Sequence, residues 1–166
     1  MKHIISVVVR NNSSVLARVS SLFGRRGFNI DSLSVSATQD PQISRITVVV
    51  NGDDAALDQV VKQTSKLVDT ISVTALHEDN TVARELLLVK VLAPSADDTR
   101  RIVMMSDLYG AGVLDISPDH TVVLELTGTS AKIDEFVAEL LSDTQGSKIL
   151  EVCRTGITAM ERGLHD

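Results

Sequence analysis

The feature of this sequence that most constrains its fold is the periodicity of its apolar residues, which changes between strand-like and helix-like in the same order twice. Continuous or alternating apolar runs predict β-strands, whereas apolar residues spaced by three and four predict the buried stripe of a helix. In the first half these patterns predict strand 3–9, helix 15–23, strand 28–37, strand 46–50, helix 53–68 and strand 70–76. The order of the first half is therefore βαββαβ.

The second half repeats this order after a polar connector at 77–81. Its patterns predict strand 86–93, helix 95–109, strand 112–116, strand 121–127, helix 130–141 and strand 149–153. The repeat has a period of about 80 residues, without visible sequence identity between the halves. We therefore expect an α+β protein with two ferredoxin-like βαββαβ modules in tandem, a first domain at 1–77 and a second domain at 82–166.

Two modules of this size have more apolar strand surface than their own helices can cover. The chain has 166 residues, and a domain of half that length buries only about 60% of its unfolded surface. Two helices cover one face of a four-stranded sheet, so the sheet edges and part of the other face stay open. We therefore expect association between copies of the chain, most simply a twofold homodimer.

The composition excludes several classes of function. The net charge is −6, with 8 basic and 14 acidic side chains in residues 81–166, whereas phosphate binding needs clustered Lys and Arg. Only 2% of the residues are aromatic, so stacking platforms for bases are not expected. No apolar run approaches the roughly 20 residues of a membrane span, and no signal-peptide pattern follows the N-terminus. We expect a soluble, cytoplasmic protein without a nucleic-acid or membrane partner.

The sequence offers little support for catalysis. The four histidines lie far apart without metal-ligand spacing, and neither a nucleophile elbow nor a phosphate-binding Gly-x-x-x-x-Gly-Lys loop is present. The one cysteine, Cys153, stands in an apolar run, which favours a small buried hydrophobe over a reactive thiol. We therefore expect neither catalytic residues nor a metal site in this chain.

The best candidate for a binding site is the junction 10–16, where the first strand ends and the first helix begins. Helix N-termini leave backbone N–H groups unpaired at the positive end of the dipole, which suits a carboxylate. Asn11 and Asn12 add amide carbonyls that can accept a hydrogen bond from an ammonium group. The local pattern fits both an amino-acid site and plain capping of the helix, and by itself it favours capping.

The segment 10–19, Arg-Asn-Asn-Ser-Ser-Val-Leu-Ala-Arg-Val, resembles the first loop and helix of ACT domains. More closely, it resembles the regulatory (small) subunits of acetolactate synthase, also called acetohydroxyacid synthase. The resemblance continues in the same order along nearly the whole chain, through 22–33, 40–47, 62–68, 84–91, 128–134 and 151–156.

This resemblance implies a non-catalytic subunit in valine and isoleucine biosynthesis. Members of the family bind the large catalytic subunit, raise its activity and confer feedback inhibition by a branched-chain amino acid, usually valine. The large subunit carries thiamine diphosphate, Mg²⁺ and FAD, so none of these cofactors is expected in this chain. A stand-alone amino-acid-sensing ACT module that regulates another protein is the alternative function.

In the family, the effector lies between the ACT domains of a dimer and touches the first loop of one domain and the second strand of the other. Carried over by position, the resemblance implies four effector contacts from one chain and two from its partner: Asn11, Ser14, Val15 and Leu16, with Asn29 and Ile30. The family usually has glycine where Ser14 stands. Serine adds a Cβ and a hydroxyl; it would be strained if this position needs a positive φ, whereas its side chain could instead cap the helix. In either case we expect crowding of the effector and weaker valine binding.

Overall fold

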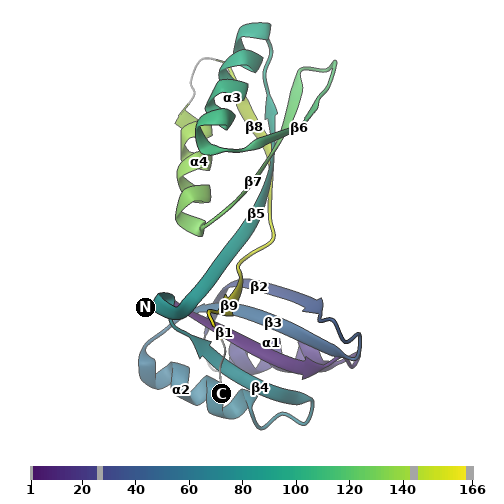
Figure 1. The fold of residues 1–166 in the computed structure, drawn as a ribbon, viewed down its shortest axis with the longest axis vertical. Coiled ribbons are helices and arrows are strands. Elements are labelled where there is room, and N and C mark those ends of the chain that lie inside the picture. The colour runs from purple at the N-terminus through teal and green to yellow at the C-terminus, as the bar shows by residue number, and fades with distance from the viewer. Residues whose placement is uncertain (1, 26–27, 143–145, 164–166) are drawn as a thin grey trace. The chain divides into compact units, whose positions relative to one another are not determined.

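The computed structural model describes residues 2–25, 28–142 and 146–163. The outermost residues of the two expected domains, and Arg26 and Gly27 within the resemblance segment 22–33, lie outside this description. The chain divides into two compact units (Figure 1). Unit 1 comprises Met1–Ala83 together with Gly156–Asp166, and unit 2 comprises Arg84–Thr155.

Unit 1 is a four-stranded antiparallel sheet with two helices on one face. Its elements are β1 (Lys2–Arg10), α1 (Val15–Arg25), β2 (Asn29–Ala37), β3 (Ile43–Asn51), α2 (Asp54–Thr64), β4 (Thr70–Leu76), the short 3-10 helix η1 (Glu78–Asn80) and β9 (Thr158–Glu161). The strand order is β2-β3-β1-β4, which leaves β2 and β4 at the two edges. The βαββαβ order expected for the first half is confirmed.

Alternation along the central strands decides which side chains the helices of unit 1 cover. In β1, Ile5, Val7 and Val9 are fully buried and pack with Val19 and Phe23 of α1. Burial of one such side chain contributes about 1.5–3 kcal/mol. This apolar layer fixes α1 on the sheet, and therefore also the loop through which the chain passes from β1 into α1.

The opposite face of the same sheet is covered by the C-terminal strand β9 (Thr158–Glu161), an element that no sequence pattern predicts. Ile157 and Ala159 form a buried cluster with Val49 and Leu76. The backbone N–H of Ile157 also donates to Oγ of Ser32 in β2 at 3.2 Å. The expected second domain at 82–166 therefore differs from the compact unit Arg84–Thr155, because the C-terminal residues pack on the first sheet.

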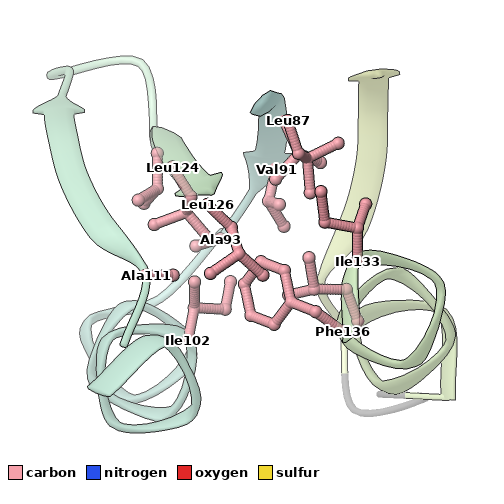
Figure 2. Close-up of a cluster of buried hydrophobic side chains, with 12 residues drawn as sticks. Leu87, Val91, Ala93, Ile102, Ala111, Leu124, Leu126, Ile133 and Phe136 are labelled. Atoms are coloured by element: carbon pink, nitrogen blue, oxygen red, sulfur yellow. The ribbon is translucent and has the colours of Figure 1, made fainter. Parts of the chain in front are cut away.

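Unit 2 repeats the architecture. Its elements are β5 (Thr81–Leu92, which begins in unit 1), α3 (Ala96–Tyr109), β6 (Gly112–Ile116), β7 (Thr121–Gly128), α4 (Ser130–Ser142) and β8 (Lys148–Arg154). The strand order is β6-β7-β5-β8, and β9 pairs with β5 off this path. Figure 2 shows the core of unit 2, in which side chains from the two helices meet those of β5 and β7: Leu87, Val91, Ile102, Leu124, Leu126, Ile133 and Phe136.

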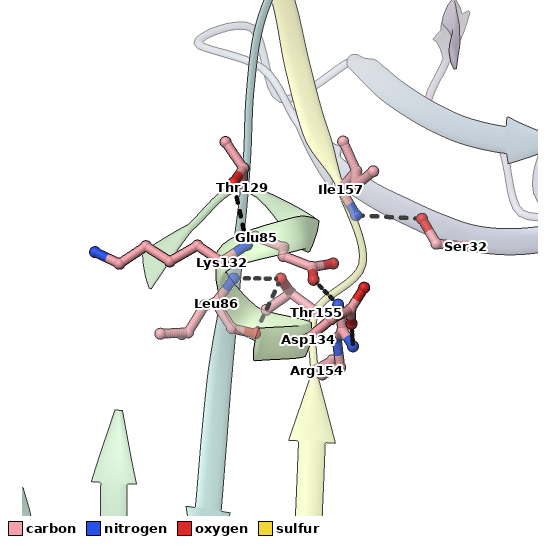
Figure 3. Close-up of polar contacts among 9 residues, drawn as sticks. All are labelled: Ser32, Glu85, Leu86, Thr129, Lys132, Asp134, Arg154, Thr155 and Ile157. Atoms are coloured by element: carbon pink, nitrogen blue, oxygen red, sulfur yellow. Dashed lines mark hydrogen bonds and ion pairs between the residues drawn. The ribbon is translucent and has the colours of Figure 1, made fainter. Parts of the chain in front are cut away.

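A buried carboxylate closes the end of unit 2 where the chain enters on β5 and leaves on β8. Glu85 is only 4% exposed and is paired with Arg154, which also donates to Asp134 at 2.6 Å (Figure 3). Beside this cluster, the backbone N–H of Thr155 donates to the carbonyl of Leu86 at 3.0 Å. β5 and the end of β8 are therefore held side by side where the chain enters and leaves unit 2.

Two sequence-based expectations about individual side chains are wrong. Cys153 is exposed, because it lies opposite Leu88 of β5, on the sheet face that the helices do not cover. Val68, expected on the inner face of the second helix, is 86% exposed, because α2 ends at Thr64 and Val68 lies in the turn before β4. In the described part of the chain, no helix is long and apolar enough to cross a membrane.

Candidate functional site in the loop between β1 and α1

The loop between β1 and α1 is held on one side by the connection between β2 and β3. The backbone N–H of Asn11 donates to the carbonyl of Gln42 at 2.7 Å, and Nδ2 of Asn11 donates to the carbonyl of Pro41 at 3.0 Å. The backbone N–H and Nδ2 of Asn11 thus both donate hydrogen bonds within the fold. Its Oδ1 accepts no hydrogen bond from the described residues and remains an acceptor for a ligand.

On the other side, the loop is held by the turn before β4. Nδ2 of Asn12 donates to Oδ1 of Asp69 at 2.7 Å, and Nη1 of Arg18 in α1 donates to Oδ2 of Asp69 at 2.8 Å. The carbonyl of Asp69 accepts from the backbone N–H of Arg10 at 2.8 Å. No sequence pattern singles out Asp69, although its carboxylate is buried and its partners lie in and beside the candidate loop.

The other predicted loop residues differ in how far their side chains are exposed. The side chain of Val15 is buried in the core of unit 1, whereas Leu16 is 39% exposed and available for contact. Ser14 is half-buried, and its carbonyl accepts from the backbone N–H of Arg18 at 3.1 Å.

Ser14 does not adopt the positive φ at which a serine would be strained. Within the described residues, His120 is the one non-glycine residue at positive φ. The backbone at Ser14 therefore does not require glycine, and Ser14 differs from a glycine there by its Cβ and hydroxyl.

Asn29 and Ile30 lie at the opposite end of the sheet from the loop. Asn29 and Lys2 both pair with Asn51, whereas Asn11 follows Arg10 at the other end of β1. Nine residues of strand separate these ends by about 25–30 Å. One chain therefore does not bring Asn29 and Ile30 to the loop.

The strand that carries Asn29 is an edge strand with an irregularity at its beginning. In the described residues β2 pairs with β3 and with no other strand, so its outer hydrogen-bonding groups are open. The register shifts between Ile30 and Ser32, which leaves Asp31 in a bulge, where Oδ2 accepts from Nδ2 of Asn51 at 2.7 Å. Bulges of this kind re-aim side chains at sheet edges and binding sites.

An open cleft of about 680 Å³ adjoins the loop. Its lining combines a cation, a carboxylate, amides and apolar side chains: Arg10, Asn11, Asn12, Asp40, Pro41, Gln42, Ile43 and Ile71. Such a lining suits a small zwitterion with an apolar side chain and contains no nucleophile paired with a base. Within the described ranges, no three His, Cys, Asp or Glu side chains are grouped so as to hold a metal ion.

Comparisons with known proteins agree with this architecture in both halves. A family model described as the AHAS small subunit-like ACT domain matches residues 5–72, and one described as the small subunit of acetolactate synthase matches residues 84–163. The probable acetolactate synthase small subunit of Methanothermobacter thermautotrophicus is 45% identical over 161 residues, which cover 97% of this chain and 93% of that protein. The acetolactate synthase isozyme 3 small subunit of Escherichia coli is 39% identical over 165 residues, 98% of this chain and 97% of that protein.

A solved structure extends the likeness to the whole fold. The crystal structure of the acetolactate synthase small subunit from Thermotoga maritima matches with a TM-score of 0.88 and 34% identity, and the match covers 99% of each chain. The same family is indicated by two family models in the right order, by relatives at 39–45% identity and by this structure. The chain belongs to the family of acetolactate synthase small subunits, and its N-terminal half carries that family's ACT domain.

Proposed function

We propose that this chain is a non-catalytic regulatory subunit that binds the large catalytic subunit of acetolactate synthase and raises its activity. We further propose that it confers feedback inhibition by valine or a related branched-chain amino acid. The observation that carries the proposal is a loop of ACT type, anchored on both sides, in a chain that belongs to the small-subunit family. Thiamine diphosphate, Mg²⁺ and FAD are assigned to the large subunit.

The separation of Asn11 from Asn29 supports an effector site shared by two copies of the chain. An open antiparallel edge such as β2 can pair with the same edge of a second copy about a twofold axis. That pairing sets the beginning of one β2 against the end of the other. Because Asn11 is bonded to Pro41, just beyond the end of β2, the partner's Asn29 would approach it.

The chemistry of this shared site matches an amino acid with a branched apolar side chain. The N-terminal turn of α1 offers backbone N–H groups and a positive dipole end to the carboxylate. Oδ1 of Asn11, with Asn29 of the partner copy, would accept hydrogen bonds from the ammonium group. Leu16 and the partner copy's Ile30 supply apolar contact, whereas Val15 acts through its place in the core.

Reconstitution with the large subunit encoded in the same genome tests the proposal. Acetolactate formation is measured with the large subunit alone, with the chain added, and with the chain plus valine, leucine or isoleucine. The proposal expects a higher rate with the chain and a lower one when the effector is added. An unchanged rate, together with valine binding to the isolated chain by calorimetry, would favour the stand-alone ACT module instead.

A further inference from the structure

We propose that Asp69 is the positioning residue of the effector loop and that Arg18 must neutralise its carboxylate for the loop to accept an anionic ligand. The proposal rests on the proposed function, since the ligand is the amino acid assigned above to the loop between β1 and α1.

Asp69 binds the chain before, within and after the loop. Its carbonyl accepts from the backbone N–H of Arg10, where β1 ends. Its two carboxylate oxygens accept from Nδ2 of Asn12 at 2.7 Å and from Nη1 of Arg18 at 2.8 Å. Loss of the Asp69 carboxylate therefore frees Asn12 and Arg18, which lie on the two sides of Ser14, whereas the backbone bond to Arg10 does not depend on the side chain.

The burial of this group argues against an ordinary surface ion pair. Asp69 is 7% exposed, whereas the side chain of Arg18 is 54% exposed and Asn12 is exposed. Arg18 and Asn12 can be hydrated without a protein partner, so neither needs a buried carboxylate. Asp69, in contrast, has lost most of its hydration and depends on these two short bonds, of which the one to Arg18 is charge-assisted.

The charges of Asp69 and Arg18 have opposite effects on the binding of an anionic ligand, which a purely structural contact would not have. The carboxylate of Asp69 is bonded to Asn12, whose carbonyl accepts from the backbone N–H of Val15 at the start of α1. An uncompensated negative charge there opposes the positive dipole end and repels a ligand carboxylate. The guanidinium of Arg18 cancels that charge, so losing Arg18 and losing the charge of Asp69 have unequal consequences.

The test compares valine binding by full-length variants in calorimetry. Arg18→Gln leaves the buried anion unpaired and is expected to weaken valine binding about 10- to 100-fold. Asp69→Asn removes the charge but keeps an oxygen for Asn12, so its loss is smaller. The double variant Arg18→Gln/Asp69→Asn is expected to bind valine more tightly than Arg18→Gln alone. Asp58→Asn, at an exposed carboxylate of α2, is the matched control and binds valine as the wild type does.

Asn12→Ala supplies a second variant that leaves the ion pair in place and removes an exposed side chain. It is expected to weaken valine binding about 2- to 10-fold, because the loop loses one of its anchors to Asp69. Unchanged affinity in this variant, or a double variant at Arg18 and Asp69 that binds no better than Arg18→Gln, overturns the proposal. A wild-type chain that binds no branched-chain amino acid refutes the proposed function instead, so the two failures are distinguishable.

Discussion

Nη2 of Arg45 donates a hydrogen bond of 2.9 Å to the carbonyl of Ala159, so a side chain of β3 holds the C-terminal strand of the protein. Ala159 and Ile157 are buried against the same sheet. The ACT unit of this chain is thus completed by residues that follow the whole second unit in sequence. Burial of the sheet face opposite the helices therefore depends on β9 and Ile157.

The first prediction concerns the isolated ACT unit. A fragment that ends at Ala83 exposes Val49 and Leu76, whereas the same fragment joined to 156–163 by a short Gly-Ser linker covers them. Ala83 packs against the cluster that contains Ile157, so the linker has a short distance to span. We expect the joined fragment to be more stable by about 2–4 kcal/mol, measured by urea denaturation. Equal stability of the two fragments would contradict the role assigned to β9.

The second prediction concerns Gly156, at which the chain turns onto the first sheet. Gly156 has φ +78°, and a Cβ at this position would lie 3.0 Å from Oγ of Ser32. Gly156→Ala therefore combines a left-handed conformation with a close contact, and should destabilise the protein by about 1–3 kcal/mol in thermal denaturation. Gly163→Ala is the control, because Gly163 has φ +77° and, among the described residues beyond its chain neighbours, no atom lies within 4 Å of the added Cβ. If both variants lose the same stability, the contact with Ser32 contributes nothing.

The third prediction concerns the pH dependence of unit 2. The hydroxyl of Ser95 donates to Asp98 at 2.6 Å and Arg101 donates at 2.7 Å, and these bonds hold the pKa of Asp98 below its ordinary value of 3.8. Because the folded pKa is the lower one, the stabilisation is complete above about pH 4 and is lost as the pH falls through the folded value.

The corresponding variant is Asp98→Asn, measured by urea unfolding at pH 7 and at pH 3. Its stability deficit relative to the wild type should be clear at pH 7 and should shrink at pH 3. Asp97→Asn is the control, since Asp97 is exposed and forms a surface pair with Arg100. A deficit of equal size at both pH values would refute the assignment.

The fourth prediction concerns Ser14. Because the backbone there does not need glycine, Ser14→Gly acts by removing side-chain volume beside the proposed carboxylate site. Relief of crowding of about 1–3 kcal/mol should tighten valine inhibition of the reconstituted enzyme about 5- to 150-fold. Titrations with valine, leucine and isoleucine measure the effect. If the wild type is inhibited as strongly as the variant, the serine does not crowd the effector.

The repeated βαββαβ order could be predicted from sequence because its signals are local. The stripe of Val15, Val19 and Phe23 identifies α1 within one window, and Ser95 caps α3 as its type suggests. β9 could not be predicted in this way. It has four residues, and its hydrogen bond to Arg45 spans 114 positions, so its burial depends on a partner that no local pattern reveals.

The residues of the candidate site also differ in whether local sequence patterns could predict them. Asn11 belongs to a local motif and could be named from sequence, whereas Asp69, 57 positions after Asn12, enters only through the tertiary fold. Cys153 and Val68 show the converse error. Each has an apolar sequence neighbour, which favoured a buried position. Cys153 is exposed because of the sheet face on which it lies, and Val68 is exposed because α2 ends before it.

The central claim is that the effector site is completed by a second copy of the chain, and a mixed dimer tests it most directly. Asn11→Ala and Asn29→Ala chains carrying different tags are co-expressed, and the heterodimer is purified on both tags. Each variant alone has both shared sites damaged, whereas the heterodimer has one site with Asn11 and Asn29 intact. We predict that each variant alone binds valine weakly and that the heterodimer binds it with wild-type affinity at half the wild-type stoichiometry. A heterodimer that binds valine no better than either variant alone would contradict a site shared between two copies.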